Sequence, residues 1–120
     1  MARITPLTQE SVSPLVKEAF RKHVEEYSAS LTNMKYTLGH SLLSFDVYMQ
    51  WYPLFEKVKE IVGKRTASLF AWSVSTASNC PLCSTFFRKI IIEAGENPEH
   101  LELNEYEKLL LDFGSAISQH

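Results

Sequence analysis

Apolar residues recur every three or four positions along most of the chain, and this is the period of an amphipathic helix. The pattern predicts about six helices, several of which begin or end at residues that suit a helix terminus. No stretch alternates apolar and polar residues over the length of a strand, and the sequence contains no internal repeat. We therefore expect an all-α protein, an orthogonal helical array that forms one domain over residues 1–120.

Three helices are expected in the first half of the chain. A serine followed by a proline suits the start of a helix over residues 14–27, with the serine as its cap. A second helix should cover residues 34–51 or 41–51. It is apolar on more than one side, which favours burial against several helices or another subunit. Pro53 should kink the chain or start a third helix, which carries apolar residues over 54–62.

Three more helices are expected in the second half, over residues 64–78, over 81–94 and from Asn104 onward. Gly95 suits the end of the middle one. Asn104 with Glu107 three residues later is typical of a capping box at the start of the last one. In the helix over 81–94, the residues expected to be buried are Leu82, Phe86, Phe87, Ile90 and Ile91. The apolar face of the last helix is made of Leu109, Leu110, Phe113 and Ile117.

Composition excludes several classes of protein. A net charge of −2 gives no electrostatic reason to expect nucleic acid or an anionic membrane as a partner. No apolar run approaches the roughly 20 residues that cross a bilayer. The first residues lack the apolar core of a secretory signal, so we expect a cytoplasmic protein.

The most informative stretch holds both cysteines of the chain, Cys80 and Cys83. Asn79 or Cys80 suits an N-cap, and Pro81 suits the first turn of a helix. Free backbone N–H groups and the positive end of the helix dipole lie at such a turn, and they favour thiolate over thiol. The sequence therefore predicts a redox-active cysteine pair that alternates between dithiol and disulfide.

Two other interpretations of the cysteine pair stay open. A closed zinc site needs four ligands, and there is no second CxxC. The histidines show no ligand spacing to one another, so only a site shared between subunits would bind zinc, and we predict no metal and no cofactor. Alternatively, both cysteines are buried packing residues. The histidines are His23, which we expect at the surface, and His40, His100 and His120.

The arrangement of residues around this pair resembles the alkylhydroperoxidase D-like, or carboxymuconolactone decarboxylase, family. The resemblance covers roughly residues 13–113, and its specific part is a CxxC at the end of a helix rich in serine and alanine. The segments that carry it are Met34 to Ser41, Gly63-Lys64-Arg65, Ser68 to Ser78, Cys80-Pro81-Leu82-Cys83 and Ala94-Gly95-Glu96.

The resemblance implies an all-helical trimer or hexamer that reduces hydroperoxides with its cysteine pair. By analogy with the family, Cys83 would attack the peroxide, and Cys80 would resolve the sulfenic acid into a disulfide. A dithiol, either a thioredoxin-like protein or a lipoyl group, would restore the thiols. The helix-start argument alone favours Cys80 as the thiolate. We therefore expect Cys80 to be the sulfur that a partner thiol reaches.

Two positions depart from the family's proton relay. The family has a glutamate twelve residues before the first cysteine, where this chain has Ser68. It has a histidine four residues after the second cysteine, where this chain has Phe87. Neither replacement shuttles a proton, so we name His40 as the candidate substitute. Weaker candidates are Glu56, Glu60, Tyr36 and Tyr48.

Together these observations predict a cysteine-dependent peroxidase of the peroxiredoxin type, acting in antioxidant defence as a homo-oligomer. Aromatic residues between Phe45 and Tyr52 are expected to contribute to the subunit interface. The alternative is a non-enzymatic helical oligomer, or a redox sensor whose cysteines do not turn over. A decarboxylase ranks third, because no matching set of acid–base residues is present.

Overall fold

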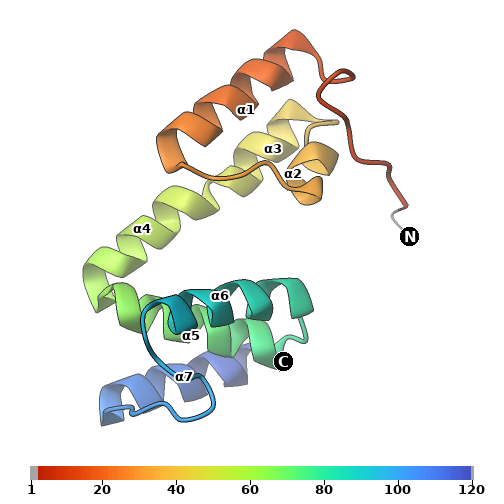
Figure 1. Cartoon of the computed structure of the whole chain (residues 1–120). Coiled ribbons are helices and arrows are strands. Elements are labelled where there is room, and N and C mark those ends of the chain that lie inside the picture. Colours follow the sequence, from red (N-terminus) through yellow and green to blue (C-terminus); the bar gives the residue numbers. More distant parts are fainter. Residues whose placement is uncertain (1–2, 120) are drawn as a thin grey trace. The chain divides into compact units, whose positions relative to one another are not determined.

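The computed structural model describes residues 3–119, and all the regular secondary structure among them is helical (Figure 1). No strand occurs among these residues, so the all-α prediction is confirmed. The chain divides into two compact units, Met1–Leu54 and Phe55–His120. The single domain expected over residues 1–120 stays a prediction, and His120 lies outside the described residues. The helices are α1 (Pro14–Tyr27), α2 (Asn33–Leu38), α3 (Leu42–Met49), α4 (Trp51–Val62), α5 (Lys64–Ala77), α6 (Pro81–Glu93) and α7 (Glu105–Ser118).

The described residues form seven helices and not six, because the segment predicted as the second helix forms two separate helices. The chain leaves the helix at Gly39, which is buried. A Cβ atom there would lie 2.8 Å from the ring of Phe20, so only glycine fits. Two residues later, the Ser41 side chain accepts a hydrogen bond from the Ser44 amide at 3.2 Å and starts α3. The close approach and the new cap together divide the segment.

The first unit has an aromatic and aliphatic core between α1 and α3. Ser13 caps α1 by accepting a hydrogen bond from the Val16 amide at 3.3 Å, as the sequence predicts. The Phe20 ring packs against Phe45 at 5.0 Å and edge-on against Tyr36 at 5.4 Å. These rings hold the short helix α2 against α1.

His23 is buried, so its expected place at the surface is wrong. It is 4% exposed and packs edge-on against the rings of Phe45 and Tyr52. Its Nε2 atom has no hydrogen-bond partner among the described residues. Burial lowers the pKa of His23, and the nearby Lys35 ammonium lowers this pKa further. The sequence did contain a signal, since position 23 lies three residues after the buried Phe20 on the same helix face.

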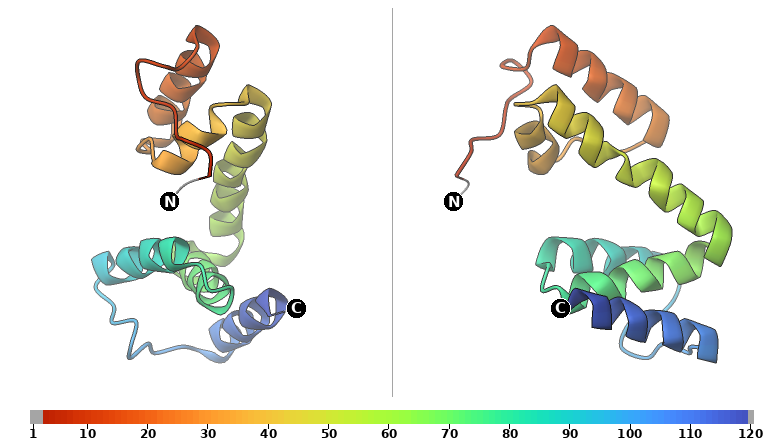
Figure 2. Two further views of the ribbon diagram at one scale, coloured as in Figure 1. Left: turned by 90° about the vertical axis from the view of Figure 1, so that its right-hand side faces the viewer. Right: turned by 180° about the vertical axis from the view of Figure 1, so that it is seen from behind.

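The second unit is organised around α5, which lies between α6 and α7 (Figure 2). Helix α5 is buried on several sides, and three of its buried residues are serines. Their hydroxyl groups donate to carbonyls of the same helix, as with Ser68 to Lys64 at 3.0 Å and Ser75 to Ala71 at 2.6 Å. A buried hydroxyl is satisfied in this way without a partner from another helix.

Small residues let α7 approach α5 closely. A Cβ atom at Gly114 would lie 2.5 Å from the Ser73 hydroxyl oxygen and 3.0 Å from the Phe70 ring. No side chain fits at that position without displacing a neighbour, so the glycine sets the distance between the two helices.

A cluster of charged side chains ties the start of α5 to the connection between α6 and α7. The Arg65 guanidinium pairs with both Glu96 and Glu107, and it donates to the Glu102 carbonyl at 3.0 Å. Glu107 also forms the predicted capping box with Asn104, through bonds of 3.0 and 2.8 Å. The hydrogen bond from Arg65 lowers the pKa of Glu107. We call these residues the Arg65 clamp.

Candidate redox site at the start of α6

The cysteine turn begins where α5 ends. Asn79 adopts a left-handed conformation, with φ of 52°. Its amide donates to the Thr76 carbonyl at 3.1 Å, and the Cys80 amide donates to the Ser75 carbonyl at 3.0 Å. This pair of bonds is the Schellman motif, in which asparagine is one of the few residues that tolerate the left-handed position. Asn79 therefore ends α5 and places Cys80 at the start of the next helix.

Cys80 is the N-cap of α6, which resolves the choice that the sequence left open between it and Asn79. Its Sγ atom accepts a hydrogen bond from the Cys83 amide at 3.3 Å, and Pro81 follows in the first turn. Cys80 and Cys83 form a disulfide, with their Cα atoms 5.4 Å apart. The predicted CxxC at a helix N-terminus is thus confirmed, and the two sulfur atoms are bonded.

The disulfide lies at a half-buried position with apolar neighbours that are exposed. Both cysteines are intermediate in exposure. Phe87 and Ile91 are buried as predicted, whereas Leu82 is 74% and Phe86 is 58% exposed. The predicted burial of Leu82 and Phe86 is therefore wrong, because α5 covers only one side of α6.

Neither position of the family's relay supplies a proton to the cysteines. Ser68 is buried, and its hydroxyl donates to the Lys64 carbonyl within its own helix. Phe87 is 7% exposed and packs against the rings of Phe55 and Phe86 at 5.8 and 5.1 Å. Any general acid for the cysteine chemistry must come from another residue or from water.

His40 belongs to the first unit, and the structure gives it a local partner. It is exposed, and its Nε2 atom lies 2.8 Å from the Thr5 carbonyl oxygen, to which it donates in the matching tautomer. This bond ties the N-terminal segment to the chain between α2 and α3. A role for His40 in the chemistry of the cysteines stays a prediction.

The structure gives each of the weaker relay candidates a contact or position that is unrelated to the cysteines. Glu56 pairs with Lys59 at 2.5 Å and Glu60 pairs with Lys57 at 2.7 Å, on the solvated face of α4. Tyr36 packs against Phe20, and Tyr48 is 63% exposed.

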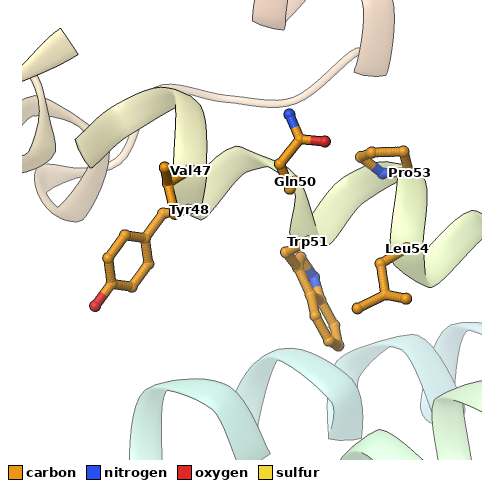
Figure 3. Close-up of a pocket in the computed structure, with 6 residues that line it drawn as sticks. All are labelled: Val47, Tyr48, Gln50, Trp51, Pro53 and Leu54. Atoms are coloured by element: carbon orange, nitrogen blue, oxygen red, sulfur yellow. The ribbon is translucent and has the colours of Figure 1, made fainter. Parts of the chain in front are cut away.

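Each unit has a hollow that opens on its surface. The first has a volume of about 630 Å³ at the junction of α3 and α4, where Figure 3 shows Tyr48, Trp51 and Leu54. Its other lining residues are Val47, Gln50 and Pro53. The second measures about 380 Å³, and α5 and α7 form its walls. It is lined by Trp72, Ser73, Thr76, Ala77, Leu111, Asp112, Ser115 and Gln119.

Sequence reasoning missed two features that position the site. One is the left-handed Asn79, although an asparagine directly after a helix is a known signal for that position. The other is the Arg65 clamp, whose partners lie 31 and 42 residues along the chain from Arg65, so no local pattern predicts it.

Two absences among residues 3–119 concern metal binding and membrane insertion. No group of three or more histidine, cysteine or acidic residues is placed to hold a metal ion. Within the same range, no helix has the length and apolar character needed to cross a bilayer.

Comparison of the chain with protein-family models, with curated proteins and with solved structures finds no match.

Proposed function

We propose that the protein is a cysteine-dependent oxidoreductase that reduces hydroperoxides and is restored by a dithiol. The observation that supports this proposal is the half-buried disulfide at the start of α6. Free amide groups of a first helical turn stabilise a thiolate, and a thiolate is the form of cysteine that attacks a peroxide. We place this activity in the cytoplasm, where thiol pools reduce such disulfides and return the cysteines to the reactive state.

The proposed cycle has three steps. The Cys83 thiolate attacks one oxygen of the hydroperoxide, the O–O bond breaks, and the alcohol leaves after taking up a proton. Cys83 is now a sulfenic acid. The Cys80 thiolate attacks its sulfur, hydroxide leaves as water after protonation, and the disulfide forms. A thioredoxin-like protein or a lipoyl dithiol then supplies two electrons and two protons, and both thiols return.

The absence of a proton donor at Ser68 and Phe87 affects the expected rate. General acid–base help contributes about 10²–10⁴-fold, so turnover without it should be slow by that factor, unless His40 or water substitutes. Slow turnover would suit a second candidate function. In that alternative the pair is a redox sensor, or belongs to a non-enzymatic helical oligomer, and its disulfide forms without fast turnover.

We further infer that the protein is a homo-oligomer, a trimer or a hexamer. Helix α7 carries four apolar residues that are each more than half exposed and are spaced along one stripe. Large exposed apolar patches are rare on monomers. The stripe consists of Tyr106, Leu109, Phe113 and Ile117.

The test of the catalytic proposal is peroxide consumption by pre-reduced protein, with Cys83→Ser and Cys80→Ser as variants. We expect the Cys83→Ser protein to consume none. The Cys80→Ser protein should consume one equivalent and stop at a sulfenic acid, which a dimedone adduct reports by mass. Equal consumption by all three proteins would exclude the cycle, and an unsubstituted protein that consumes no further equivalents when excess dithiothreitol is added would favour the sensor.

A further inference from the structure

Two exposed apolar side chains lie beside the disulfide on α6. Leu82 stands between the two cysteines in the chain and is 74% exposed, and Phe86 follows one turn later at 58%. Residues four apart share one face of a helix, so these two form a continuous surface. We call Leu82 and Phe86 the apolar ridge.

The stretch of sequence that carries the ridge is free of charge. No charged residue occurs over positions 66–87, a segment that includes all of α5 after Arg65 and the first two turns of α6. The next charged residues on α6 already have partners, since Arg88 pairs with Glu99 at 3.1 Å and Lys89 lies 3.6 Å from Glu93. A partner that matches this surface needs an uncharged, apolar face.

We propose that the apolar ridge is the docking surface for a protein dithiol that reduces the Cys80–Cys83 disulfide. The inference rests on the proposed redox cycle, and it selects a thioredoxin-like protein as the reductant. A thiolate attacks a disulfide along the S–S axis. Phe86 lies one turn after Cys83 on the same side of α6, so a protein that brings its thiolate to the disulfide comes close to the ridge.

The size of the ridge also favours a transient partner. An aromatic or large aliphatic side chain carries roughly 200 Å² of surface, so the ridge presents on the order of 250 Å². A stable interface buries about 800 Å² on each partner, whereas redox encounters lie at the small end of the range. The ridge is thus too small to hold a second copy of the chain permanently, and its size suits a reductant that binds, reacts and leaves.

The exchange conserves atoms and electrons. The partner's thiolate attacks Cys80 Sγ, the Cys80–Cys83 bond breaks, and Cys83 leaves as a thiolate that takes up a proton. The partner's second thiol loses its proton and attacks the partner sulfur of the mixed disulfide. Cys80 is released as a thiolate, and the partner becomes a disulfide after giving up two electrons.

The experiment compares two reductants on the oxidised, full-length protein. Dithiothreitol is the small dithiol, and thioredoxin is the protein dithiol. Timed quenches with iodoacetamide followed by mass spectrometry count the free thiols. The test variant is Leu82→Gln/Phe86→Gln, which removes apolar surface without adding charge. The matched control is Ile92→Gln, an exposed apolar residue on the same helix about 15 Å along its axis from Leu82.

We expect thioredoxin to reduce the unsubstituted protein about 100-fold faster than dithiothreitol, because docking orients the attack. The ridge variant should lose about tenfold or more of the thioredoxin rate. Its dithiothreitol rate and both rates of Ile92→Gln should stay within about twofold. Because the ridge itself carries no charge, the thioredoxin rate should also change little between low and high salt.

Two results overturn the inference. One is a ridge variant that thioredoxin reduces at the unsubstituted rate, and the other is a thioredoxin rate no higher than the dithiothreitol rate. Failure of the proposed function looks different, since the disulfide would resist dithiothreitol or the reduced protein would consume no peroxide. Circular dichroism checks the fold of each variant, and Leu82→Gln alone serves if the double variant is not helical.

Discussion

Replacing Gly114 by alanine should raise the helix propensity of α7 but worsen its packing against α5. The structure predicts that the packing effect is the larger one. In an ordinary helix interior, alanine is more stable than glycine by about 1 kcal/mol. At this position the new Cβ atom would lie 2.5 Å from the Ser73 hydroxyl, 3.0 Å from the Phe70 ring and 3.1 Å from Val74. Ordinary contacts of a Cβ atom begin near 3.4 Å.

The magnitude follows from these two effects. An extra methyl group in a tightly packed contact costs about 1–3 kcal/mol, because neighbours shift or leave their preferred rotamers. The Ser73 side chain cannot turn away freely, since it is buried and donates to the Phe70 carbonyl at 3.0 Å. After subtracting the gain in propensity of about 1 kcal/mol, we expect Gly114→Ala to lower the free energy of unfolding by about 1 kcal/mol.

The assay is urea unfolding of the second unit, followed by tryptophan fluorescence. The chain has two tryptophans, Trp51 in the first unit and Trp72 in the second. In a Trp51→Phe background the signal therefore reports the second unit alone. Ala116→Gly, at an exposed position of α7, measures helix propensity in the same helix and should cost about 1 kcal/mol.

A double-mutant cycle with Ser73→Ala makes the test specific. Removing the hydroxyl eliminates the shortest contact, so Gly114→Ala should cost about 1 kcal/mol less in the Ser73→Ala protein than in the unsubstituted one. A Gly114→Ala protein that is more stable by the full propensity difference would refute the reasoning, because it would mean that α5 and α7 are not in close contact there.

Three further predictions concern other parts of the chain. Asn79→Ala should lower the free energy of unfolding by about 1–2 kcal/mol, because alanine resists the left-handed conformation, while Asn79→Gly should leave it nearly unchanged; equal urea midpoints for the two variants would contradict this. The first unit should lose stability as pH falls below about 6.5. In that range His23 of the unfolded chain becomes protonated, whereas native His23, with its lowered pKa, stays neutral. That stability is fully present above pH 6.5, and His23→Leu should remove the pH dependence in urea titrations; a variant with the same slope would assign it to another group. Phe113→Glu should shift the mass measured by light scattering toward the monomer, while the exposed Lys108→Glu should not; an unchanged mass for Phe113→Glu would exclude the α7 stripe as the subunit interface.

Features that depend on neighbouring residues were predictable from the sequence, and features that depend on tertiary contacts were not. Ser13, Cys80 and Asn104 each cap a helix where their local sequence places them, because capping involves only the next three residues. Periodicity finds the apolar face of α6, but it does not reveal how much of that face another helix covers. Leu82 and Phe86 are therefore predicted to be buried, although only Phe87 and Ile91 of this helix are.

The same limit explains the errors at buried polar residues. His23 shares a helix face with Phe20, yet average exposure led us to place it at the surface. Its burial depends on rings from α3 and α4 that pack around it. Gly39 likewise divides a predicted helix because of a contact with Phe20, which is distant in the sequence.

The size of the loop that the disulfide closes bears on its role. Cys80 and Cys83 are three residues apart, and the first turn of α6 already holds them near each other. Closing so short a loop in the unfolded chain contributes about 2 kcal/mol at most, out of the 5–15 kcal/mol typical of a folded domain. Meanwhile the far end of α6 is fixed independently, because Glu96 follows it and pairs with Arg65. The clamp and the contact at Gly114 involve neither cysteine, so they do not depend on the disulfide. A crosslink that the fold does not need for its stability is one that the protein is able to break and re-form, and this favours a chemical role for the pair over a structural one.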